Sequence, residues 1–258
     1  MNINYLLNNT FSNDIAIDIG TDNTLIYVNG KGLVLKEPSY VAYDEKTGEI
    51  QEVGTKAKEM LGKNPQGIKV LKPINMGVIA DIELATKMIK EFISSIYNKT
   101  ILKPRIIASV CAGSTQVEQR AICDVLKSVG AREVYLIDEP LAAASGAGCD
   151  ISLARGMLIA DIGGGRCDVA SISLGHTVIG KSITTAGESF TDEIVKYIKK
   201  KYNINIGPLT AENIKTQIGC AYPFELMKTM EVYGCDVTSG LPCSVSVNSE
   251  EIREVFDV

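Results

Sequence analysis

The stretch that decides the expected fold is Ile159-Ala-Asp-Ile-Gly-Gly-Gly-Arg-Cys-Asp-Val-Ala-Ser171. An apolar run ends in Asp161, the glycines Gly163, Gly164 and Gly165 follow, and alternating residues resume through Leu174. This order predicts a strand, a tight turn and a returning strand. Consecutive glycines let backbone N–H groups approach one point closely, and a carboxylate just before them suits a hydrated divalent cation. The pair indicates a nucleotide with Mg²⁺, although most single glycine hairpins bind nothing.

A second copy of the pattern lies near the start of the chain. Residues 15–28 read Ile-Ala-Ile-Asp-Ile-Gly-Thr-Asp-Asn-Thr-Leu-Ile-Tyr-Val. Asp18 and Gly20 stand where Asp161 and Gly163 stand in the other copy. Two similar hairpins far apart in one chain predict a duplicated domain with one hairpin in each half, and facing hairpins would clasp a polyphosphate from both sides.

The composition is that of a soluble globular protein. The chain has 258 residues, 45% of them hydrophobic and 22% charged, which is enough for one large domain or two medium ones. A net charge of −5 argues against a nucleic acid as the main partner. Seven scattered cysteines without a C-x-x-C pair fit a reducing cytosol rather than a disulfide framework or a zinc site. The sequence shows neither an apolar run of membrane-spanning length nor a secretory signal.

The apolar spacing and the capping residues place the regular elements around the hairpins. Asp81 is expected to cap a helix whose inner face is formed by Ile82, Ala85, Ile89, Phe92, Ile93 and Ile96. Further expected elements are helices over 54–61, 141–147 and 187–202, a helix capped by Thr210, a helix after the capping box of Thr115 and Glu118, a final helix capped by Asn248, and strands over 105–111 and 134–137.

Three features keep two interpretations each. Glu139 follows a strand and begins a helix. It would either orient a water molecule or simply be a first-turn acid that the helix dipole stabilises. Glu212 and Lys215 form either a surface ion pair or a clamp on a ribose or base edge. Ile101 and Leu102, in a loop flanked by lysines, either tuck into the core or insert into a membrane.

A P-loop pattern appears in the second half but in the wrong context. Residues 175–182 fit G-x-x-x-x-G-K-[ST] letter for letter. A P-loop opens directly into a helix, whereas Thr177, Val178 and Ile179 are β-branched and the chain continues extended. We therefore expect a hairpin here.

These residues together resemble the superfamily of actin and heat-shock-chaperone ATPases, and within it the MreB family of bacterial actins. The resemblance covers nearly the whole chain. Its markers are Asp18–Thr24, Glu37–Ser39, Gly77–Asp81, Gly130–Pro140, Asp161–Gly165 and Ile218–Pro223. Each hairpin alone is weakly specific, and the set is highly specific.

The resemblance implies an α/β actin-like ATPase fold with two ribonuclease-H-like halves, each a mixed sheet flanked by helices. The first half would span 1–147, with a small inserted subdomain over 31–72. The second would span 148–258, with an inserted subdomain over about 183–240. The family continues past Val258 into a further glycine-rich turn that covers the other side of the adenosine, so the fold would lack its C-terminal part here.

The resemblance also implies residue roles in binding ATP and Mg²⁺. Asp18 and Asp161 match the carboxylates of the metal shell, and Asp161 with Glu139 matches the catalytic pair, in which Glu139 positions the attacking water. The two phosphate hairpins match Thr21, Asp22, Asn23 and Thr24 on one side and Gly163, Gly164 and Gly165 on the other. The turn against the adenosine matches Glu212, Asn213, Ile214 and Lys215, and the membrane-inserting loop matches Ile101 and Leu102.

The function implied is that of a weak ATPase which forms antiparallel paired filaments in the cytoplasm, on the inner face of the cell membrane. Its partners would be further copies of itself, the membrane surface and the cell-wall elongation machinery, and it would direct cell shape. The alternatives are a small-molecule kinase of the same fold and a nucleotide-poor scaffold.

The sequence departs from the family pattern at both turns. Asp22 stands where the family has a small uncharged residue, and a carboxylate beside a triphosphate is repulsive unless Mg²⁺ or a lysine offsets it. Arg166 and Cys167 replace a pair of hydroxyl residues, and Arg166 is a candidate to grip a phosphate oxygen instead.

Overall fold

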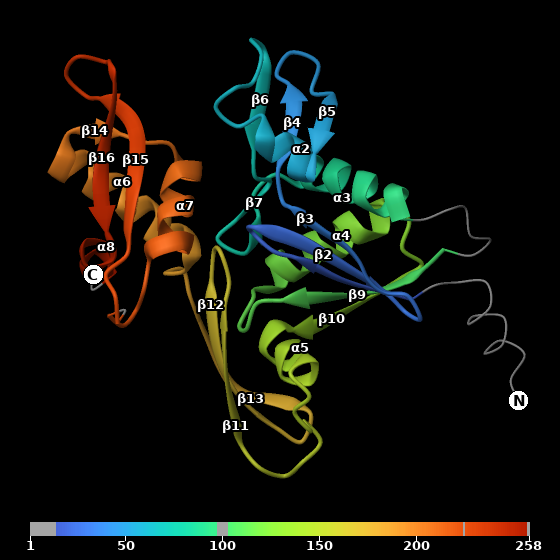
Figure 1. Cartoon of the computed structure of the whole chain (residues 1–258). Coiled ribbons are helices and arrows are strands. Elements are labelled where there is room, and N and C mark those ends of the chain that lie inside the picture. The colour runs from blue at the N-terminus through green and yellow to red at the C-terminus, as the bar shows by residue number, and fades with distance from the viewer. Residues whose placement is uncertain (1–13, 97–102, 224, 257–258) are drawn as a thin grey trace, which may run out of the picture. The chain divides into compact units, whose positions relative to one another are not determined.

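A computed structural model of the chain describes residues 14–96, 103–223 and 225–256 (Figure 1). The chain divides into two compact units, Met1–Thr184 and Thr185–Val258. Each unit has its own buried cluster of aliphatic side chains. The expected division into two halves at residue 147 remains a prediction.

A mixed five-stranded sheet organises the first unit. Its strand order is β10-β9-β1-β2-β3, with β1, β9 and β10 parallel and β1, β2 and β3 joined as antiparallel hairpins. The bounds are β1 Ile15–Ile19, β2 Asn23–Val28, β3 Gly32–Pro38, β9 Arg105–Val110 and β10 Glu133–Asp138. Because β9 and β10 are parallel, a crossover connection must join them, and helix α4 forms it.

Side-chain alternation along β1 explains where the core lies. Ile15, Ile17 and Ile19 are buried in one cluster with residues of helices α3 (Ile82–Ile96) and α4 (Gln116–Ser128). Asp18, between Ile17 and Ile19, therefore projects from the opposite face of the sheet. The alternation thus places an acidic group where the helices α3 and α4 do not cover it.

The predicted helices form, with two corrections at their ends. Asp81 Oδ1 accepts a hydrogen bond from Leu84 N at 2.9 Å, and Thr115 and Glu118 form the expected capping box. Ile82 was placed on the inner face of α3, but as the first residue of the helix its side chain is 53% exposed, whereas Leu84 and Ala85 in the same turn are buried. Thr210 does not cap its helix, since Pro208 begins the helix and Gly207 precedes it.

The remainder of the first unit consists of small sheets. Within residues 31–72, β3 belongs to the main sheet, whereas β4 (Val41–Asp44), β5 (Ile50–Val53) and β6 (Ile68–Leu71) form a separate three-stranded sheet with α2 (Gly54–Glu59). Strands β7 (Ile74–Asn75) and β8 (Val78–Ile79) make a short hairpin before α3.

The glycine-rich stretch forms the predicted second hairpin. Strands β11 (Met157–Ile162), β12 (Cys167–Ser173) and β13 (His176–Ile183) make an antiparallel sheet. Helix α5 (Glu139–Gly146) links it to β10 and contacts all three of its strands. The P-loop-like residues lie in β13 and continue as extended chain, which confirms the hairpin interpretation.

The second unit is an α/β layer of its own. Helices α6 (Gly187–Tyr202), α7 (Pro208–Ile218) and α8 (Ser249–Val255) pack with a three-stranded sheet of β14 (Ile204–Asn205), β15 (Thr229–Asp236) and β16 (Pro242–Asn248). Ile194, Ile198, Ile214 and Ile252 are fully buried among them. Asn248 Oδ1 accepts a hydrogen bond from Glu251 N at 3.0 Å, as the expected cap requires.

Helix α3 allows a matched test of the first core. Ile89 is fully buried and Ile82 is more than half exposed on the same helix. We expect Ile89→Ala to lower the free energy of unfolding by about 2–5 kcal/mol, because it leaves a cavity in the core. The control Ile82→Ala should change it by less than about 0.5 kcal/mol. Equal effects in urea unfolding would contradict this assignment of the core.

Candidate functional site

Three parallel strands bring their carboxyl ends to one edge of the main sheet. Asp18 lies near the end of β1, Cys111 follows β9 directly, and Glu139 follows β10 directly. Ligands of open α/β sheets bind outside this edge, where the strands end and the chain turns into loops and helices. The topology therefore assembles these three side chains from positions up to about 120 residues apart in the chain.

Asp18 is held by a neighbouring strand. Ser109 Oγ donates a hydrogen bond to Asp18 Oδ1 at 2.8 Å. Burial raises the pKa of Asp18; the Ser109 hydrogen bond opposes that rise, and the negative charge of Asp161 adds to it. Asp18 and Asp161 also line one cavity, so the acids of the two hairpins face the same space.

The second hairpin contributes two carboxylates rather than one. Asp161 in β11 and Asp168 in β12 are directly opposite in the antiparallel register. Like charges in such a pair repel each other, and the pKa of Asp161 is raised first by burial and then by Asp168. Asp168 is only 1% exposed, so water cannot screen this repulsion well.

Glu139 has the most perturbed carboxyl group of the site. Burial, with the added charge of Asp18 and a hydrogen bond with Asp168, raises the pKa of Glu139 to about 8. Four acidic side chains thus converge at one edge of the sheet. A divalent cation would offset their repulsion, and carboxylate oxygens are the ligands that Mg²⁺ prefers. The donor set therefore fits the expected metal.

The turn of the first hairpin is fixed by buried hydroxyl groups. Ser39 Oγ donates to the carbonyl oxygen of Gly20 at 2.7 Å and lies 3.0 Å from Thr24 Oγ1. Thr21 Oγ1 accepts from Gly77 N at 2.8 Å. Ser39 and Thr24 are fully buried and Thr21 nearly so. The hydroxyls of these threonines thus shape the turn, while the contacts of residues 21–24 with a phosphate remain a prediction.

The two hairpins lie close enough that glycine is required between them. A Cβ atom on Gly165 would lie 2.9 Å from Met76 Cα and would also strike the side chain of Thr21. A Cβ atom on Gly164 would overlap the carboxylate of Asp22. The glycines therefore allow the two turns to pack closely against each other. The sequence had suggested only that they allow a ligand to approach the backbone closely.

The charges that depart from the family pattern are both paired. Lys72 Nζ forms an ion pair with Asp22 Oδ1, so the lysine that would offset this carboxylate comes from the residue after β6. Arg166 Nε donates to the carbonyl oxygen of Met76, and Arg166 Nη2 lies 3.2 Å from Glu118 Oε1. Arg166 thus ties the second hairpin to the β7–β8 turn and to α4.

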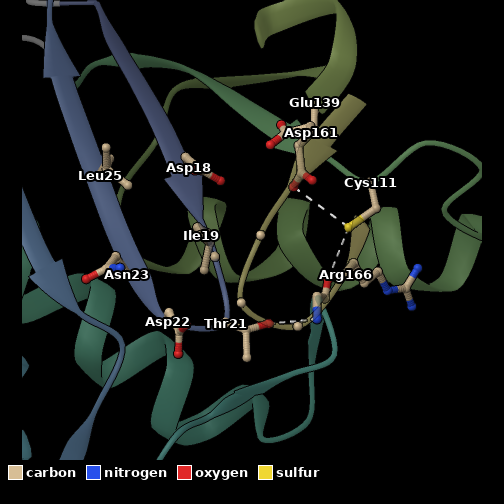
Figure 2. Close-up of a pocket in the computed structure, with 15 residues that line it drawn as sticks. Asp18, Ile19, Thr21, Asp22, Asn23, Leu25, Cys111, Glu139, Asp161 and Arg166 are labelled. Atoms are coloured by element: carbon tan, nitrogen blue, oxygen red, sulfur yellow. Dashed lines mark hydrogen bonds between the residues drawn. The ribbon is translucent and has the colours of Figure 1, made fainter. Parts of the chain in front are cut away.

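A cavity of about 180 Å³ lies between the two turns. Figure 2 shows Asp18, Glu139 and Asp161 around it, with Cys111 and Arg166 at one side. Pockets for drug-sized ligands usually measure 300–1,000 Å³. The cavity therefore suits a phosphate chain with its cation better than a whole nucleotide. The lining residues are Asp18–Asn23, Leu25, Gly77, Cys111, Glu139, Asp161 and Gly163–Arg166.

Residues 212–215 lie in α7 of the second unit. Lys215 Nζ is 2.6 Å from Glu212 Oε2, so the two are close on one face as expected. Thr191 Oγ1 also donates to Glu212 Oε2 at 2.7 Å, and the Ile214 side chain is fully buried. Lys215 lines a second cavity together with Phe190 and Phe256. Contact of this turn with an adenosine remains a prediction, and Ile101 and Leu102 lie outside the described residues.

Several residues of the site were not predicted from the sequence. They are Ser39, Lys72, Ser109, Cys111 and Asp168. A signal existed for three of them, since Ser109 and Cys111 sit at the carboxyl end of a buried strand and an acid such as Asp168 is unusual in an apolar alternating strand. Nothing in the local sequence points to Lys72.

A pair of acid-led hairpins joined to a five-stranded mixed sheet, meeting at one cavity, defines an actin-like fold. The profile of the family described as MreB/Mbl protein matches residues 12–258. The chain belongs to this family.

Relatives and solved structures support the assignment over most of the chain. It is 44% identical over 252 residues to the cell shape-determining protein MreB of Escherichia coli (strain K12), covering 95% of this chain and 73% of that protein. Crystal structures of MreB5 of Spiroplasma citri, bound to AMPPNP and to ADP, match with a TM-score of 0.90 and 41% identity, covering 95% of this chain and 74% of theirs. A MamK double helical filament, at 19% identity and a TM-score of 0.79, shares the fold.

Among the helices that the structure describes, none has the length and apolar character needed to cross a bilayer.

The pKa of Glu139 predicts how stability depends on pH. A carboxyl group with a folded-state pKa near 8 is protonated in the folded chain where the unfolded chain is ionised. It therefore favours folding fully below the unfolded pKa, and this contribution is lost as the pH rises through about 8. Without Mg²⁺ and nucleotide, the free energy of unfolding should fall by about 2 kcal/mol between pH 6 and pH 9.

Glu139→Gln should flatten this profile, because the amide does not titrate. The exposed control Glu91→Gln should keep it. Urea unfolding at several pH values measures both, and parallel profiles for Glu139→Gln and the unsubstituted protein would contradict the assignment.

The contact between the hairpins predicts an asymmetry among glycine substitutions. Gly165→Ala should destabilise the protein by about 1–3 kcal/mol, because the methyl group meets the backbone of residue 76. Gly146 in α5 has open space around it, so Gly146→Ala should be neutral or slightly stabilising. Chemical denaturation compares the two, and a harmless Gly165→Ala would show that the turns are not in contact.

Proposed function

We propose that this chain is an ATP-binding bacterial actin that polymerises on the inner face of the cell membrane and directs cell shape and cell-wall synthesis. The observation that carries the proposal is the convergence of two acid-led hairpins on one cavity lined by Asp18, Asp161 and Glu139. The nucleotide-bound crystal structures of MreB5, and the name of the Escherichia coli relative, support it.

The hairpins would hold the phosphate chain mainly through their backbone N–H groups. Residues 163–165 carry no side chain that blocks this approach, and residues 20–24 are fixed by Ser39 and Thr24. Such fixed donors stabilise the negative charge that develops during transfer of a phosphoryl group to water. The Asp22–Lys72 pair keeps the nearby carboxylate from repelling the phosphates.

Mg²⁺, when bound, would neutralise phosphate charge and carry an ordered water shell. Asp18 and Asp161 are the residues that would hold this shell. Glu139 would accept a hydrogen bond from the attacking water once its own carboxyl group is ionised. Because repulsion from Asp18 and Asp161 contributes to the raised pKa of Glu139, a nearby cation would favour the ionised form that orients water.

The proposal also includes assembly into filaments. These filaments would contact the membrane surface and the elongation machinery. The membrane contact is assigned to Ile101 and Leu102 from their sequence alone. The family membership and the filament of the related MamK fold support self-assembly.

Glu139→Gln tests the hydrolytic step. It should retain ATP binding and slow phosphate release at least about 10²-fold, because the amide cannot act as a base. Glu91→Gln on the exposed face of α3 serves as the matched control and should behave as the unsubstituted protein. Phosphate release, binding of a fluorescent ATP analogue, and sedimentation with anionic liposomes are measured on the same samples.

Each alternative function has its own outcome. Turnover that requires an added sugar or acid, without any sedimenting polymer, would indicate a kinase. Absence of binding at millimolar nucleotide with Mg²⁺ would indicate a scaffold. Unchanged phosphate release in Glu139→Gln would remove Glu139 from the proposed mechanism.

A further inference from the structure

A sulfur and two carboxylates lie together beside the cavity, which Cys111 and Glu139 line. The ligand atoms of Cys111, Glu139 and Asp168 are all within 4.8 Å of one another. They come from three elements: Cys111 follows β9, Glu139 begins α5 and Asp168 lies in β12. Cys111 is 5% exposed and Asp168 is 1% exposed, so these groups are shielded from bulk water.

Asp168 has an oxygen that lacks a partner. Its Oδ2 accepts a hydrogen bond from Ala112 N at 3.4 Å, but Oδ1 is buried without any hydrogen-bond partner in the part of the chain that the structure describes. A buried carboxylate oxygen left unpaired is costly, and a bound cation or a proton removes that cost. While the site is empty, protonated Glu139 supplies such a proton through its hydrogen bond with Asp168, and a bound cation would replace that proton.

The spacing of the cluster matches one class of cation. Cys111 Sγ donates a hydrogen bond to Glu139 Oε1 at 3.7 Å. Around a tetrahedral Zn²⁺, with Zn–S of about 2.3 Å and Zn–O of about 2.1 Å, a sulfur and an oxygen ligand are about 3.6 Å apart. A zinc ion could thus bridge Cys111 and Glu139 at their present separation once the thiol proton leaves, and the ligand atom of Asp168 lies within 4.8 Å of both.

The geometry points to a binding site for a thiophilic divalent cation of the Zn²⁺ class, with Cys111, Glu139 and Asp168 as its three protein ligands. The fourth position remains open to a water molecule, reached through the cavity that Cys111 and Glu139 line. Thiolate sulfur favours Zn²⁺ over Mg²⁺. On binding, the thiol of Cys111 loses its proton to solvent and forms the sulfur–metal bond.

This site differs in its ligands from the proposed Mg²⁺ shell of Asp18 and Asp161, and its existence does not depend on the proposed function. The two sites meet at Glu139. If the proposed function holds, a zinc-bound Glu139 has its oxygen engaged and does not orient the attacking water, so zinc occupancy would oppose hydrolysis.

Co²⁺ in place of Zn²⁺ gives a direct test in the full chain without nucleotide. We expect one equivalent of Co²⁺ to produce a thiolate charge-transfer absorption that Zn²⁺ displaces and excess Mg²⁺ does not. Cys111→Ser should abolish the charge-transfer band, and Asp168→Asn should weaken Co²⁺ binding at least about tenfold. Cys167→Ser, beside Asp168 in β12, is the control for Cys111→Ser and should retain the band.

Persistence of the charge-transfer band in Cys111→Ser, or its loss in the exposed Cys235→Ser, would overturn the proposal. A measurement on the unsubstituted protein covers the case in which a variant fails to fold. Zinc-edge X-ray absorption should show one sulfur ligand at about 2.3 Å with oxygen ligands beside it. A shell of oxygens only, or of two or more sulfurs, would equally overturn the proposal.

Discussion

Repulsion among four carboxyl groups is the constraint on which the rest of the site depends. Asp18, Glu139, Asp161 and Asp168 are drawn together by strand pairing, and burial removes the water that would screen them. A folded chain tolerates such a cluster only if protons or cations offset the charge. The repulsion among these carboxylates weakens the metal-free fold, and a bound cation relieves it. Stability and cation binding are therefore linked at this edge of the sheet.

The duplicated pattern determines how the cluster is assembled. Each hairpin supplies an acid followed by a turn, and the parallel strands β1, β9 and β10 bring their ends to the same edge. The intervening elements then adjust the site. Lys72, after the small sheet, neutralises Asp22, and Arg166 joins the second turn to Glu118. These two pairs accompany the two departures from the family pattern, which shows that each departure has a structural partner within the first unit.

The sequence predicted those elements that are determined by residues close together in the chain. The hairpins followed from their glycines and alternation, helix α6 from its apolar spacing, and the cap of α4 from Thr115 and Glu118. The error at Ile82 arose because periodicity identifies a helix face but does not tell whether the terminal residue of the helix is covered. Thr210 was taken as a cap because threonine is a frequent one, while Pro208 already supplies a favourable first helical residue.

The acidic residues of the site could be predicted from the sequence, but the residues that pair with them could not. Asp18, Asp161 and Glu139 stand beside turn or helix signals, so their place at the cavity could be predicted from the sequence, while their roles remain a prediction. Lys72 meets Asp22 across 50 residues, and Cys111 meets Asp168 across 57, so only the folded chain brings these pairs together. Contacts of this kind depend on strand register, which a single sequence does not specify.

The buried pair of Thr24 and Ser39 determines when the first turn loses its conformational entropy. Their hydrogen bonds fix the shape of the first turn in the folded chain. The turn therefore loses its conformational entropy during folding and not when a ligand binds. An incoming phosphate chain would thus meet donors that are already in place, and its association would require little rearrangement of this loop.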